Sequence, residues 1–131
     1  MSEHAPINVA LVDDDPSLCR AVKRLLSAAG IGCATFSSAE AFLAREDHAE
    51  PDCLLLDVQL GGMSGFDLHR KLTAMGRLLP IIYVTAHDES EARQQAEQAG
   101  CFAFLRKTDP AEAILSAIRR ATAEIPQMQS Q

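Results

Sequence analysis

Five polar side chains stand at the ends of apolar runs in this sequence. Asp13 and Asp14 follow the first run, Asp57 lies near the end of the third, Thr85 ends the fourth and Lys107 follows the fifth. Carboxylates that are crowded together repel one another, and a hard divalent cation such as Mg²⁺ relieves that repulsion by binding their oxygens. Aspartate also serves as a covalent nucleophile in phosphoryl transfer. If these side chains meet in the fold, they form a site suited to Mg²⁺-dependent phosphoryl transfer.

Asp57 is the candidate nucleophile of this set. It ends a run of apolar residues and precedes a glycine-rich loop, Gly61–Gly65. A carboxylate placed there loses part of its hydration beside other acids, so we expect the metal-free site to raise the pKa of at least one carboxylate. Three aspartates, one Mg²⁺ and the ammonium of Lys107 together carry no net charge, which suits the arrival of a phosphoryl group. Taken singly, each residue is more typical of a turn, a strand end or a solvated surface, and only their shared placement favours a site.

The elements that must position these residues are five apolar runs that alternate with helix-like segments. The runs cover residues 7–12, 33–36, 53–58, 81–85 and 102–105. The first, third and fourth runs are continuously apolar, which is typical of parallel strands that are buried on both faces. Alternating strands and helices imply right-handed crossovers with helices on both faces of the sheet. Ligands of such sheets bind beyond the carboxyl ends of the strands, so we expect the polar residues to converge there.

The helices are predicted from their start signals. Asp15 precedes Pro16, which matches an N-cap followed by proline at the first helical position. Ser37 and Glu40 have the spacing of a capping box, so a second helix is predicted to begin at Ser37. We expect three further helices to begin near Ser64, Asp88 and Asp109.

Composition excludes several classes of protein. The 131 residues are enough for one domain, and the 18 acidic against 12 basic residues argue against direct nucleic-acid binding by this chain. The sequence contains neither an apolar run long enough to span a membrane nor a basic segment followed by an apolar one at its start, so we expect a cytoplasmic location. The four cysteines lack C-x-x-C spacing, and we expect them to be reduced and to behave as small hydrophobic residues.

The motifs resemble the receiver domain of bacterial two-component response regulators, in the CheY-like superfamily. The resemblance rests on the order and spacing of Val12-Asp13-Asp14, Leu56-Asp57, Met63-Ser64-Gly65, Val84-Thr85-Ala86 and Lys107. The segment 37–43, with the sequence SSAEAFL, is similar to FixJ-type receivers in particular. We therefore expect a receiver domain over residues 7–124, an N-terminal tail over 1–6, and a C-terminal tail or the start of a linker over 125–131.

The resemblance implies a fold and a role for each site residue. The fold is α/β and flavodoxin-like, a (βα)5 doubly wound parallel five-stranded sheet with strand order 2-1-3-4-5. Asp57 is then the phosphoacceptor, and Thr85 and Lys107 contact the phosphoryl group. Thr85 and Phe104 form the conformational switch. Mg²⁺, with Mn²⁺ as a substitute, is held by Asp13, Asp14, Asp57 and the backbone carbonyl of Gln59.

The resemblance also implies partners. A sensor histidine kinase or a phosphotransfer protein donates the phosphoryl group, and the chain promotes its own phosphorylation and dephosphorylation without being a turnover enzyme. The face formed by the fourth helix, fifth strand and fifth helix then controls a homodimer or an output domain, with transcription regulation as the outcome. Alternatively, a stand-alone receiver acts as a phosphate shuttle or sink.

Two functions from other classes fit less well. Phosphohydrolases of the haloacid-dehalogenase type use Asp-x-Asp, whereas Gln59 stands two residues after Asp57 and no cap domain fits in 131 residues. A flavodoxin-like redox protein needs aromatic rings around its flavin, and this chain has one tyrosine and no tryptophan. Turnover of a small phosphate ester would support the first alternative, and a flavin colour would support the second.

The chain departs from the usual receiver pattern at two positions. Gly61 and Thr108 stand where receivers usually have proline. Without proline a cis peptide costs about 2.5–4 kcal/mol, so we expect the bond between Lys107 and Thr108 to be trans. Gln59 and His87 each lie two residues after a site residue, and we expect them to tune the lifetime of the acyl phosphate.

Overall fold

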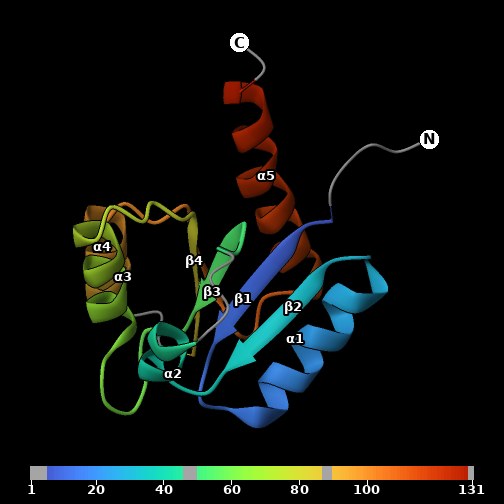
Figure 1. Cartoon of the computed structure of the whole chain (residues 1–131). Coiled ribbons are helices and arrows are strands. Elements are labelled where there is room, and N and C mark those ends of the chain that lie inside the picture. The colour runs from blue at the N-terminus through green and yellow to red at the C-terminus, as the bar shows by residue number, and fades with distance from the viewer. Residues whose placement is uncertain (1–5, 46–49, 87–89, 130–131) are drawn as a thin grey trace.

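The computed structural model describes residues 6–45, 50–86 and 90–129, within which five strands alternate with five helices (Figure 1). The strands are β1 (Asn8–Val12), β2 (Gly32–Phe36), β3 (Cys53–Leu56), β4 (Ile81–Thr85) and β5 (Ala103–Arg106). All neighbouring strands are parallel, and their order across the sheet is β2-β1-β3-β4-β5. The predicted fold class and strand order are therefore confirmed.

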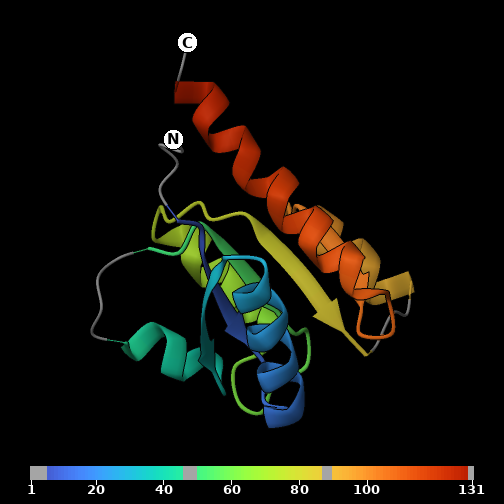
Figure 2. The same ribbon diagram turned by 90° about the vertical axis from the view of Figure 1, so that its right-hand side faces the viewer.

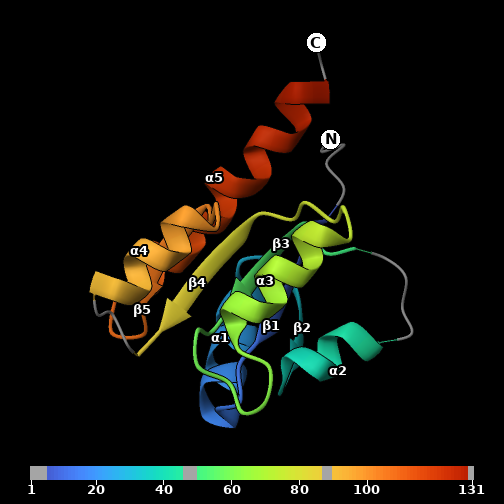
Figure 3. The same ribbon diagram turned by 90° about the vertical axis from the view of Figure 1, so that its left-hand side faces the viewer.

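The helices cover both faces of the sheet. They are α1 (Pro16–Ala28), α2 (Ala39–Ala44), α3 (Gly65–Ala74), α4 (Ser90–Gln98) and α5 (Ala111–Gln129). Helices α1 and α5 lie on one face, which faces the viewer in Figure 2. Helices α2, α3 and α4 lie on the other face, which faces the viewer in Figure 3. In the part of the chain that the structure describes, none of the helices is both long and apolar enough to cross a membrane.

The central strand β3 shows why the continuous apolar runs belong to a doubly covered sheet. All four of its residues are fully buried. Leu54 and Leu56 pack into the core beneath α2, α3 and α4, whereas Cys53 and Leu55 pack into the core beneath α1 and α5. The strand ends at Leu56, two residues before the predicted end. The N–H of Asp57 still donates to the Val12 carbonyl (3.1 Å), and the carbonyl of Val58 instead accepts the N–H of Gly65 (2.9 Å) at the start of α3.

The starts of α1, α2 and α3 test the helix-start signals that were predicted from the sequence. Asp15 caps α1 by accepting the N–H of Ser17 (3.0 Å), and Ser64 caps α3, where Asp67 completes a capping box. The predicted capping box at Ser37 is wrong. Ser38 caps α2 instead, by accepting the N–H of Ala41 (3.0 Å), because the chain stays extended one residue longer than the pattern suggested.

The last two helices differ from expectation in their ends. Asp88, the predicted start of the fourth helix, lies outside the described residues. Helix α5 continues to Gln129, beyond Glu124, where we expected the domain to end. Residues 121–125 contain no glycine or proline, and the helix passes through Pro126, a residue type that usually ends or kinks a helix. The division into a receiver domain and a C-terminal tail stays a prediction.

Candidate functional site

Three carboxylates gather at the carboxyl ends of β1 and β3. These strands are neighbours in which Val12 pairs with Leu56, so the residues that follow them leave the sheet at the same level. Oxygens of Asp13, Asp14 and Asp57 all lie within 4.8 Å of one another. Asp13 and Asp57 are buried, with 1% and 4% of their surface exposed, whereas Asp14 is exposed. The predicted convergence of the three aspartates is therefore found.

Lys107 is the cation of the site. Its Nζ lies 3.0 Å from Oδ2 of Asp13 and 3.2 Å from Oδ2 of Asp57. The backbone N–H of Lys107 donates to the carbonyl of Thr85 (2.9 Å), which anchors the end of β5 beside β4. The peptide bond between Lys107 and Thr108 is trans, as predicted.

The other predicted site residues lie around this cluster and differ in how deeply they are buried. Thr85 is fully buried at the end of β4, between β3 and β5. The backbone N–H of Gln59 donates to Oδ1 of Asp57 (3.3 Å), so Gln59 lies directly beside the cluster. Phe104 is buried under Tyr83 with a ring separation of 6.2 Å. His87 lies outside the described residues.

Burial dominates the electrostatics of Asp13. Loss of hydration raises the pKa of Asp13 and the charge of Asp57 raises it further, whereas the hydrogen bond from the Asp15 N–H and the nearby ammonium of Lys107 oppose the rise. The expected rise in a carboxylate pKa is therefore found, with burial rather than crowding as its main cause. Burial also lowers the pKa of Lys107, but contacts with the two carboxylates outweigh it and leave that pKa raised.

The buried oxygen Oδ2 of Asp13 is not fully satisfied. Lys107 contacts it as an ion pair, yet among the described residues no donor reaches it with hydrogen-bond geometry. Buried polar atoms in native proteins almost always have a partner, because leaving one unpaired costs about 1–3 kcal/mol. A cation bound among the three carboxylates would supply that partner, and hard oxygen ligands are those that Mg²⁺ prefers. The residues present therefore fit a divalent cation.

Gly65 explains the glycine in the motif Met63-Ser64-Gly65. A Cβ at this position would lie 2.1 Å from the backbone carbonyl oxygen of Asp57. Only glycine allows α3 to begin so close to Asp57, the residue that follows β3. The glycine of this motif therefore lets the start of α3 pack against the backbone of the candidate nucleophile.

Arg93 is a residue of this region that reasoning from the sequence missed. Its guanidinium carbon lies 4.8 Å from the ring centre of Phe104, a cation–π contact between α4 and β5. Phe104 is thus covered by Tyr83 from inside and by Arg93 from outside. No local motif marks Arg93, because the contact depends on how α4 packs beside β5.

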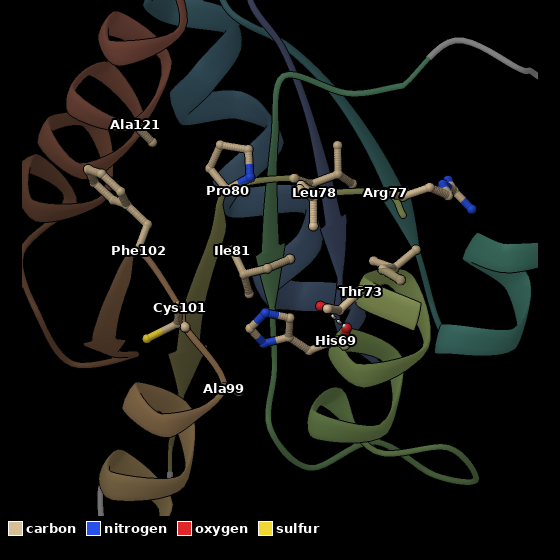
Figure 4. Close-up of a pocket in the computed structure, with 13 residues that line it drawn as sticks. His69, Thr73, Arg77, Leu78, Pro80, Ile81, Ala99, Cys101, Phe102 and Ala121 are labelled. Atoms are coloured by element: carbon tan, nitrogen blue, oxygen red, sulfur yellow. Dashed lines mark hydrogen bonds between the residues drawn. The ribbon is translucent and has the colours of Figure 1, made fainter. Parts of the chain in front are cut away.

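A cavity of about 480 Å³ lies elsewhere, between α3, the start of β4 and the α4–β5 turn (Figure 4). His69, Ile81, Cys101 and Phe102 are among its lining residues. Nδ1 of His69 forms a hydrogen bond with the hydroxyl of Tyr83 (2.9 Å). The cavity borders the amino end of β4, whereas Thr85 ends that strand, so it is separate from the acidic cluster.

Comparisons with known proteins agree with this geometry. Residues 9–119 match the family described as the response regulator receiver domain. The response regulator protein TodT of Pseudomonas putida is 35% identical over 130 residues, which cover 99% of this chain and 57% of TodT. The chain thus spans little more than half the length of this relative.

Two solved structures share the fold at appreciable sequence identity. The structure of FixJ-N has a TM-score of 0.83 and 29% identity, and the match covers 92% of this chain and 96% of FixJ-N. The response regulator StyR has a TM-score of 0.83 and 36% identity, over 96% of this chain and 65% of StyR.

Proposed function

The chain belongs to the response regulator receiver domain family, and from this premise we propose that it accepts a phosphoryl group on Asp57 in a two-component system. The observation that carries the proposal is the contact of one cation, Lys107, with two buried carboxylates, Asp13 and Asp57, at the end of the sheet. A histidine kinase or a phosphotransfer protein would donate the group from a phosphohistidine.

We propose that Mg²⁺, or Mn²⁺ in its place, is held by Asp13, Asp14, Asp57 and the backbone carbonyl of Gln59. The clustered oxygens and the unsatisfied Oδ2 of Asp13 support this assignment. When bound, the metal supplies positive charge that offsets the charge of the transferring group. The pKa of Lys107 is raised, so this residue remains an ammonium at neutral pH and adds a second positive charge beside Asp57.

The transfer itself uses a carboxylate oxygen of Asp57 as the nucleophile. A bond forms between this oxygen and phosphorus while the bond from phosphorus to the donor imidazole nitrogen breaks, and the released imidazole takes up a proton. The ammonium of Lys107, 3.2 Å from Oδ2 of Asp57, stabilises the negative charge on the group as it arrives. The hydroxyl of Thr85, at the end of the adjacent strand, then binds a phosphoryl oxygen.

The signal would pass from this site to the surface through Thr85 and Phe104. Movement of Thr85 toward the phosphoryl group would allow the Phe104 ring to reorient, and the ring carries Arg93 on its outer side. The face of α4, β5 and α5 would then bind a second copy or an output domain. Couplings of this kind are typically about 1–3 kcal/mol, enough to shift a population of conformations. A phosphate shuttle without an output domain is the alternative outcome of the same chemistry.

Intact-mass measurement after incubation with acetyl phosphate and Mg²⁺ tests the proposal. We expect the parent protein to gain one phosphoryl group, and Asp57→Asn to gain none, because the amide keeps the shape but is not a nucleophile. Asp52→Asn is the matched control, since Asp52 accepts the N–H of Asn8 at the opposite end of the sheet and should not affect labelling. Equal labelling of the parent and Asp57→Asn would refute the assignment of Asp57.

A further inference from the structure

Glu40 makes a hydrogen bond far from its own helix. It lies in the first turn of α2, and its Oε2 accepts the backbone N–H of Met63 (2.8 Å) in the loop between β3 and α3. We propose that Glu40 is a positioning residue, which holds this loop in the shape that places the Gln59 carbonyl for metal binding. The inference rests on the proposed function. It adds Glu40, a residue of α2, which supplies no ligand to the proposed metal site.

The backbone of this loop can adopt many conformations, so a contact from another element is needed to hold it in one of them. Gly61 and Gly62 are adjacent, and Gly62 has a φ of 79°, a conformation that favours glycine. Glycine loses more conformational freedom on ordering than any other residue, so this stretch gains little order from its own backbone. Among the residues that the structure describes, the bond from Met63 is the hydrogen bond that ties the middle of this loop to another helix, while the side chains of Leu60 and Met63 pack against the core.

Both ends of the loop are already fixed, which makes the middle the part that Glu40 controls. At one end, the N–H of Gln59 donates to Oδ1 of Asp57 (3.3 Å). At the other end, the N–H of Gly65 donates to the carbonyl of Val58 (2.9 Å). Between these points the chain passes through the two glycines to Met63, where Glu40 contacts it.

The shape of the contact is specific. A Cβ on Gly62 would lie 2.8 Å from Oε2 of Glu40, so the carboxylate occupies space that only glycine leaves open. The start of α2 does not need this carboxylate, because the side chain of Ser38 caps the helix by itself. Glu40 is therefore available to the loop, and its position does not follow from helix capping.

A carboxylate could also act on the metal site merely through its negative charge, and two variants separate the possibilities. Glu40→Gln removes the charge but keeps an oxygen that can accept the Met63 N–H. Glu40→Ala removes both. Ser38→Ala is the matched control, because it weakens the cap of α2 without touching the bond to Met63.

The experiment combines two readouts on these purified variants. Hydrogen exchange of the Met63 amide, followed by NMR in metal-free protein, reports on the contact without requiring any activity. Calorimetry with Mg²⁺ then reports on the metal site. We expect Glu40→Ala to speed exchange of the Met63 amide and to weaken Mg²⁺ binding, each by about threefold to tenfold, the size of one lost hydrogen bond. Glu40→Gln should stay closer to the parent than to Glu40→Ala, and Ser38→Ala should leave both readouts unchanged.

Several results would overturn the inference. Parent-like exchange at Met63 in Glu40→Ala would show that the contact does not hold the loop. Parent-like Mg²⁺ affinity in that variant would show that the contact does not serve the metal site. Equal weakening in Glu40→Gln and Glu40→Ala would assign the effect to charge instead. A parent protein that binds no Mg²⁺ would refute the proposed metal site itself, a failure distinct from the other three.

Discussion

Replacing Asp13 with asparagine should stabilise the metal-free protein, although it alters a buried residue of the site. The asparagine amide would keep an oxygen for the Asp15 N–H, which in the parent donates to Oδ1 of Asp13 at 2.8 Å. Its nitrogen would replace the Oδ2 that contacts Lys107, and Lys107 would keep its contact with Asp57. What disappears is a buried negative charge whose pKa is raised mainly by burial. A group whose pKa is raised in the folded state opposes folding once it is ionised.

The distances give the expected size of the effect. At an effective dielectric constant of about 20, charges 4.8 Å apart repel by about 3.5 kcal/mol, and Asp13 has two such neighbours in Asp57 and Asp14. The attraction to Lys107 at 3.0 Å is about 5.5 kcal/mol on the same scale. The repulsion from Asp57 alone is smaller than the attraction to Lys107, and solvent screening weakens the repulsion from the exposed Asp14. Burial, the largest cause of the raised pKa of Asp13, therefore decides the sign of the effect. We expect Asp13→Asn to raise the free energy of unfolding by about 1–2 kcal/mol at neutral pH without metal.

Urea unfolding with a chelator and again with excess Mg²⁺ measures this effect. The advantage of Asp13→Asn should be complete above the raised pKa and should shrink as pH falls toward 3.8, the ordinary value for aspartate, since the parent carboxyl is then protonated as well. Mg²⁺ should reverse the order, because a ligand that binds only the folded state stabilises the protein with the intact site. Asp52→Asn serves as the control for an aspartate outside the cluster. If Asp13→Asn unfolds more readily than the parent in chelator, the reasoning about the crowded charges is wrong.

Three further predictions test other parts of the structure. Lys107→Ala should slow phosphorylation by acetyl phosphate by about a hundredfold while Mg²⁺ binding persists, and loss of Mg²⁺ binding would instead make Lys107 a structural residue. Gly65→Ala should lower the free energy of unfolding by about 1–3 kcal/mol in urea titrations, because its Cβ would meet the Asp57 carbonyl oxygen, and a parent-like value would mean that α3 shifts freely. Burial lowers the pKa of His69 below 6.5, so its stabilising contribution is complete above 6.5 and is lost as pH falls. The stability advantage of the parent over His69→Gln should therefore shrink between about pH 7 and pH 5 in the same assay, and a constant difference would contradict the lowered pKa.

The sequence predicted the elements better than their ends. The continuous apolar runs correctly indicated strands buried on both faces, since helices on each side of a parallel sheet cover both faces of its central strands. The strand order came from the family resemblance, because apolar periodicity does not report which strands are neighbours. The capping box at Ser37 failed because Ser37 and Ser38 are both suitable caps, and it is Ser38 whose side chain accepts the N–H of Ala41.

Part of the site could also be predicted from the sequence, and part could not. Asp13, Asp57 and Lys107 could be singled out from the sequence because each stands after an apolar run, and parallel strands bring their carboxyl ends together. The sequence could not show that Lys107 contacts both carboxylates, or that burial, more than crowding, raises the pKa of Asp13. Those properties depend on how deeply each side chain lies, which follows from the packing of all the elements.

By itself, the sequence determined the alternation of strands and helices, the helix caps at Asp15 and Ser64, and the residue types gathered at one edge of the sheet. These features follow from local backbone preference and from the periodicity of burial, which act over a few neighbouring residues. Tertiary structure alone decided the contacts of Glu40 with Met63 and of Arg93 with Phe104. Such pairs are separated along the chain and meet only when whole elements pack against one another, so no local pattern specifies them.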